Sequence, residues 1–129
     1  MSEFEFIDAY QSGIELIAMA AMDFATLFFA YVVAAHLVGK SIGKLIAIAM
    51  SAIYSFFLVG PFVAIVSTQG SLNHLISQVV IQYPDSAYFS GYSPGLAFSL
   101  LISLIPALTA WISSLFYMHG YVRRGAHGP

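Results

Sequence analysis

The sequence contains no cysteine, and charged side chains make up only 8% of its 129 residues. The lack of cysteine excludes disulfides, thiolate metal sites and cysteine nucleophiles. Apolar residues make up 60% of the chain, and a chain this short cannot bury so much apolar surface inside a soluble domain. The length also leaves no room for a soluble catalytic domain beside a membrane domain.

Three apolar runs account for most of the chain, and each is long enough to cross a bilayer as a helix. They span residues 14–38, 45–66 and 95–118, and the second and third contain no charged residue. The link 39–44 is so short that the first two runs should form an antiparallel hairpin. The sequence therefore predicts an all-α integral membrane protein with three transmembrane helices in one membrane domain, residues 1–129.

The outer connection, residues 67–94, has a pattern of its own. Gly70 precedes a periodic segment and Pro84 ends it, which predicts an amphipathic helix over residues 71–83 in the outer membrane interface. A β-strand through residues 79–81 is the alternative. The apolar side chains that recur at helical spacing are Leu72, Leu75, Ile76, Val79, Val80 and Tyr83.

Basic residues occur on only one side of the three runs. Lys40 and Lys44 lie in the short link, and Arg123 and Arg124 follow the third run. Because basic residues next to membrane helices stay cytoplasmic, we expect the N-terminus outside and the C-terminus in the cytoplasm. The acidic first residues differ from a cleavable signal, and the lack of an Arg-rich leader favours a bacterial inner membrane. The net charge of −2 implies no nucleic-acid partner.

Asp23 is the most informative single residue, because it lies near the middle of the first run. An ionised carboxylate at that depth costs at least about 2.5–3.5 kcal/mol, so it should face protein or water. Glu15 and Thr26 lie on the same broad side of the helix, together with Met19 and Met22. This stripe either lines an ion or proton pathway or forms hydrogen bonds with hydroxyl groups of a neighbouring helix.

Small residues recur at every fourth position, which allows helices to approach closely. Three helices offer few internal surfaces, so we expect at least one of these faces to pack on another subunit. The alternative is that they all meet inside one three-helix bundle. The helix-packing faces on the second and third runs are Ala47, Ser51 and Ser55, and Gly95, Ser99, Ser103 and Ala107.

No set of residues predicts a reaction or a cofactor. His36 and His119 lie at the inner ends of two runs, where bis-histidine haem ligation is one interpretation. The favoured interpretation is that each interacts with the C-terminal helix dipole, so no haem or metal is expected. The sequence contains no Ser/His/Asp set and no HExxH, and no carboxylate pair has acid–base spacing on one side of the membrane. It favours a non-enzymatic subunit that assembles in the lipid bilayer with copies of itself or with larger membrane subunits. The alternative is an oligomeric ion or proton channel with Asp23 lining the lumen.

Overall fold

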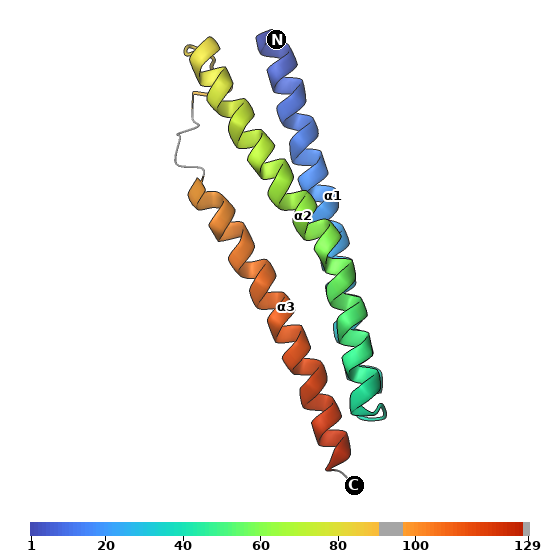
Figure 1. Cartoon of the computed structure of the whole chain (residues 1–129). Coiled ribbons are helices and arrows are strands. Elements are labelled where there is room, and N and C mark those ends of the chain that lie inside the picture. Colours follow the sequence, from blue (N-terminus) through green and yellow to red (C-terminus); the bar gives the residue numbers. More distant parts are fainter. Residues whose placement is uncertain (91–96, 128–129) are drawn as a thin grey trace.

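The computed structural model describes residues 1–90 and 97–127, with residues 97–103 described by their backbone alone. Figure 1 shows an elongated arrangement in which the first two helices run antiparallel and the third runs alongside them. These ranges contain no strand, so the all-α class is confirmed and the β-strand alternative for residues 79–81 is wrong. The helices are α1 (Glu3–Val38), α2 (Lys44–Gln82) and α3 (Ala97–Ala126).

Both α1 and α2 are long and apolar enough to cross a membrane. Their 36 and 39 residues correspond to lengths of about 54 and 58 Å, against a hydrocarbon core of about 30 Å. The paired helices are therefore longer than a crossing requires. Each would project roughly 25 Å beyond the hydrocarbon when it crosses.

The segment expected to form a separate interfacial helix is the end of α2 instead. Residues 71–82 continue α2 without a break at Gly70, and Tyr83 is the C-cap. The predicted helical periodicity is confirmed, but its apolar face packs on protein. Leu72 and Val79 are buried, because the first turns of α1 provide a partner for this face along the hairpin.

The start of α1 extends eleven residues before the apolar run. A reciprocal capping box begins the helix: the Ser2 amide donates to the Glu5 carboxylate at 2.7 Å, and the Glu5 amide donates to Ser2 Oγ at 3.3 Å. Such a box satisfies two of the N–H groups that a helix N-terminus leaves unpaired. The sequence prediction that the first helix begins at Ile14 follows apolarity alone and misses this signal.

The α1–α2 hairpin is held by buried residues with a period of seven. On α1 these are Phe6, Gly13 and Ala20, and on α2 they include Leu72 and Val79. A repeat of 3.5 residues per turn keeps one seam of each helix facing the other. The helices approach closely at Gly13, where a Cβ atom would lie only 2.5 Å from Leu72 Cδ2.

Two apolar clusters stabilise the two ends of the fold. The outer cluster, Phe6, Val79 and Phe89, packs the segment after α2 onto the start of α1. Tyr83 donates a hydrogen bond to the Met1 carbonyl at 3.0 Å, and Ser86 donates one to the Glu3 carboxylate. The inner cluster joins all three helices and consists of Tyr31, Ala35, Ala47, Tyr54, Leu58, Met118 and Val122.

Candidate functional site

Hydroxyl groups link α1 to α2 inside the inner cluster. The Tyr31 and Tyr54 rings stack with centroids 4.0 Å apart and planes 7° from parallel. The Tyr31 hydroxyl lies 2.6 Å from Ser51 Oγ. Ser51 donates its one hydroxyl hydrogen to the Ala47 carbonyl at 2.8 Å, so Tyr31 is the donor in the first contact.

The same network continues from α2 to α3. The Ser114 hydroxyl lies 3.1 Å from the Tyr54 hydroxyl and 2.6 Å from the Trp111 carbonyl. The Trp111 indole N–H donates to Ser55 Oγ at 3.0 Å. Every hydroxyl of Tyr31, Tyr54 and Ser114 has a partner, so the network is a satisfied structural connection between helices rather than a poised acid or base.

A groove of about 210 Å³ opens beside this network, near the middle of the three helices. Its surface is almost wholly apolar, and its one aliphatic hydroxyl, on Ser55, already accepts the Trp111 hydrogen bond. Such a groove suits a lipid chain or an apolar side chain, and it offers no group for catalysis. The residues that line it are Phe24, Ser55, Leu58, Val59, Phe62, Ala107, Leu108 and Trp111.

The polar residues in the middle part of α1 that the sequence singles out face away from the bundle. Glu15, Asp23 and Thr26 are exposed, and Met19 and Met22 are 64% and 71% exposed. We call these five residues the α1 stripe. Thr26 Oγ1 donates to the Met22 carbonyl at 2.9 Å, but within the described ranges neither carboxylate has a hydrogen bond or ion pair. The nearest candidates on α2 have other partners, because the hydroxyl groups of Ser51, Tyr54 and Ser55 are bonded within the network.

The predicted helix-packing residues of α2 lie inside the protomer. Ala47 is fully buried, and Ser51 and Ser55 are half-buried within the hydrogen-bonded network. Ala107 is half-buried in the groove. Gly95 and the side chains of Ser99 and Ser103 lie outside the described part of the chain.

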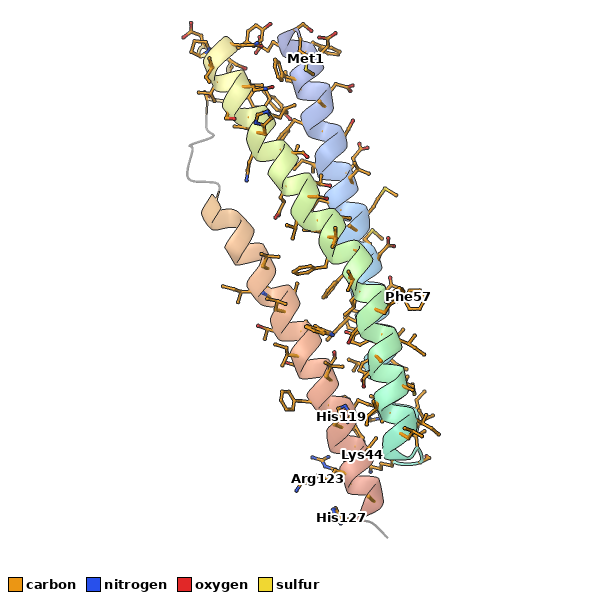
Figure 2. The ribbon with its side chains drawn as sticks, in the orientation of Figure 1. Met1, Lys44, Phe57, His119, Arg123 and His127 are labelled. Carbon is orange, nitrogen blue, oxygen red and sulfur yellow. The ribbon has the colours of Figure 1, made fainter. Side chains whose placement is uncertain are left out.

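Charge is divided between the two ends of the molecule. Figure 2 shows Lys44 and Arg123 together at one end and Met1 at the other. Lys40 and Arg124 belong to the same basic end, where each lies 5.9 Å from the Tyr121 ring centroid. The predicted topology anchors therefore share one end of the bundle, as a membrane protein with that orientation requires.

The two candidate haem ligands have different surroundings. His36 Nδ1 lies 3.0 Å from the Tyr121 hydroxyl and 3.4 Å from the Tyr117 hydroxyl, so it links α1 to α3. His119 lines a pocket at the basic end. Among the described residues, no group of three or more His, Asp or Glu side chains is arranged to hold a metal ion.

Sequence reasoning identified the α1 stripe but missed the Tyr31–Tyr54 stack and the part played by Ser114. The available signal was a set of hydroxyl-bearing side chains in the inner halves of all three runs. No known protein family, curated protein or solved structure matches this chain. Its function is therefore inferred from its own residues.

Proposed function

We propose that this chain is a non-enzymatic subunit of a membrane assembly, in which the α1 stripe contacts a second subunit. The observation that carries the proposal is the outward position of Asp23 at the middle of an apolar helix. Facing lipid, an ionised carboxylate at that depth costs at least about 2.5–3.5 kcal/mol. A neighbouring subunit would remove this cost by supplying hydrogen-bond donors.

The membrane placement is supported by the surface of the helices. Large apolar side chains are exposed on all three, among them Phe29 (64%), Leu45 (81%), Phe56 (76%) and Phe116 (74%). So many exposed large apolar side chains are typical of a protein in contact with lipid or with other subunits. We infer three crossings, with α3 as the third, in a bacterial inner membrane.

The inferred orientation predicts the access of single cysteines from outside the cell. Ser90→Cys should react with a membrane-impermeant maleimide in intact cells, because Ser90 is exposed and follows α2 at the end of the molecule opposite the basic residues. Ser41→Cys, in the basic link, should react only after permeabilisation. The chain has no native cysteine, so labelling reports the introduced site alone. The reverse pattern would contradict the orientation.

The inferred interface predicts which positions cross-link in membranes. Met22→Cys and Thr26→Cys flank Asp23 on the stripe, and oxidation should join them to a second chain as a disulfide. This reaction requires Cα atoms within about 7 Å. Phe57→Cys is the matched control, because Phe57 is 58% exposed on α2 and points away from the bundle (Figure 2).

A covalent product of twice the chain mass would show self-assembly, and a product of another mass would show a different partner. Both outcomes support the subunit role. Equal cross-linking at Phe57 would show random collision instead. Because a disulfide needs a second thiol, a link to a different protein requires a cysteine in that protein, and no product at either stripe position would contradict an interface between copies of this chain. The mass of the wild-type protein in mild detergent checks the same point without oxidation.

An oligomeric ion or proton channel is the second candidate. It is favoured by the alignment of Glu15, Asp23 and Thr26 along one exposed stripe, which would line a lumen if subunits formed a ring. Liposomes with wild-type protein should then pass cations or protons, and Asp23→Asn should stop the flux while leaving the assembly intact. If liposomes that contain the wild-type protein pass no ions under a pH gradient and an applied potential, this candidate is contradicted.

A further inference from the structure

The basic end of the bundle contains a pocket of about 640 Å³ between the α1–α2 link and the end of α3. We call it the basic pocket. Lys40, Lys44 and Arg123 line it, with His119 beside them. No Asp or Glu is among the described residues that form its walls, so the positive charge in the pocket has no acidic neighbour there. Its volume lies within the range of ordinary ligand sites.

The pocket is a product of the fold. Lys40 and Arg123 are distant in sequence, and close backbone contacts bring their segments together. A Cβ atom on Gly125 would lie only 2.2 Å from the Lys40 carbonyl oxygen, and one on Gly39 would lie 2.7 Å from Tyr121 Cβ. Neither basic pair is large enough alone to recognise a lipid, but the glycine contacts combine residues from both pairs in one cavity.

The start of α2 adds to the positive potential. Gly43, its N-cap, and Lys44, its first residue, both line the pocket, and no side chain caps this helix N-terminus. Unpaired N–H groups and the helix dipole favour a negative group at such a position. The backbone and the three basic side chains therefore favour the same kind of ligand, an anion.

We propose that the basic pocket binds the phosphate of an anionic phospholipid headgroup. Arg123 provides the forked N–H groups that suit phosphate oxygens. Ile42 and Val122 form apolar parts of the wall. Leu45 on α2 and Phe116 on α3, both more than 70% exposed, lie farther along these helices from the basic end. The acyl chains of a bound phospholipid would contact that apolar surface, whereas a soluble phosphate has no group to do so. The inference rests on the membrane placement but not on the subunit role.

Native mass spectrometry of the detergent-purified protein tests the proposal. Wild type should bind phosphatidylglycerol about tenfold more tightly than zwitterionic phosphatidylcholine, whose choline cation would meet the basic side chains. Arg123→Gln should weaken phosphatidylglycerol binding about tenfold. Arg124→Gln is the matched control, because Arg124 is adjacent and carries the same charge but lies outside the pocket walls. It should change the affinity less than about twofold.

Other outcomes would overturn the proposal. Equal binding of the two lipids would show that the headgroup is not recognised, and equal loss in both arginine variants would show only diffuse attraction. Displacement of phosphatidylglycerol by inorganic phosphate at low millimolar concentration would indicate a soluble anion as the ligand. If Arg123→Gln fails to fold, Lys44→Gln takes its place. The same spectra report the number of subunits, so failure here is distinguishable from failure of the subunit role.

Discussion

Replacing Gly39 by alanine should destabilise the fold by about 1–3 kcal/mol, the usual cost of forcing extra atoms into a packed site. A Cβ atom at this position would lie 2.3 Å from the Ala35 carbonyl oxygen and 2.7 Å from Tyr121 Cβ. Neither neighbour can move by a simple side-chain rotation, because one is backbone and the other is fixed to it. The end of α1 and the last turns of α3 would therefore have to separate.

Gly43 offers a matched control in the same link. A Cβ atom there would meet nothing within 4 Å, and its φ of −74° suits any residue. Gly43→Ala should cost less, at most about 1 kcal/mol, which is the preference for glycine over alanine at an N-cap. Thermal unfolding of both variants in detergent, followed by circular dichroism, checks the difference. Equal midpoints would show that α3 is not packed against the link as described.

The hairpin could be predicted because charge and apolarity mark its ends clearly. Lys40 and Lys44 separate two uninterrupted apolar runs, and a short link between such runs leaves only an antiparallel arrangement. The eleven residues of α1 before Ile14 were missed because they contain many polar side chains and so do not continue the apolar run. Only Phe6 and Gly13 among them are buried against α2. Their burial depends on contact with Leu72 and Val79, which are distant in sequence, so the start of α1 cannot be predicted from its own residues alone.

Of the two candidate sites, the α1 stripe could be predicted in part and the basic pocket could not. The α1 stripe follows from helical spacing, but spacing gives only relative angles around a helix. Which side of α1 faces α2 depends on packing at positions such as Gly13 and Ala20. The basic pocket could not be predicted, because close contacts at Gly39 and Gly125 bring Lys40 and Arg123 to the same cavity. Sequence separation alone says nothing about such contacts.

Replacing Tyr54 by alanine should cause the largest loss of stability of any single change described for this chain. Tyr54 is 6% exposed. Its ring stacks on Tyr31 of α1 and its hydroxyl bonds to Ser114 of α3, so its side chain has partners on both other helices. Removing a buried aromatic ring typically costs about 3–5 kcal/mol, mostly through the cavity left behind. In lipid the lost contacts are packing contacts, and helix association depends on them.

Two further variants separate the contribution of the Tyr54 ring from that of its hydroxyl group and from the general effect of losing a ring on α2. Tyr54→Phe keeps the stacked ring and removes only the hydroxyl contact with Ser114, so it should cost about 1 kcal/mol. Phe57→Ala removes a ring that is 58% exposed on the same helix and should change stability by less than about 0.5 kcal/mol. Unfolding in mixed micelles can be followed by the fluorescence of Trp111, the one tryptophan in the chain, whose indole bonds to Ser55 beside Tyr54. If Tyr54→Ala and Phe57→Ala lose equal stability, the inner cluster does not hold the three helices together.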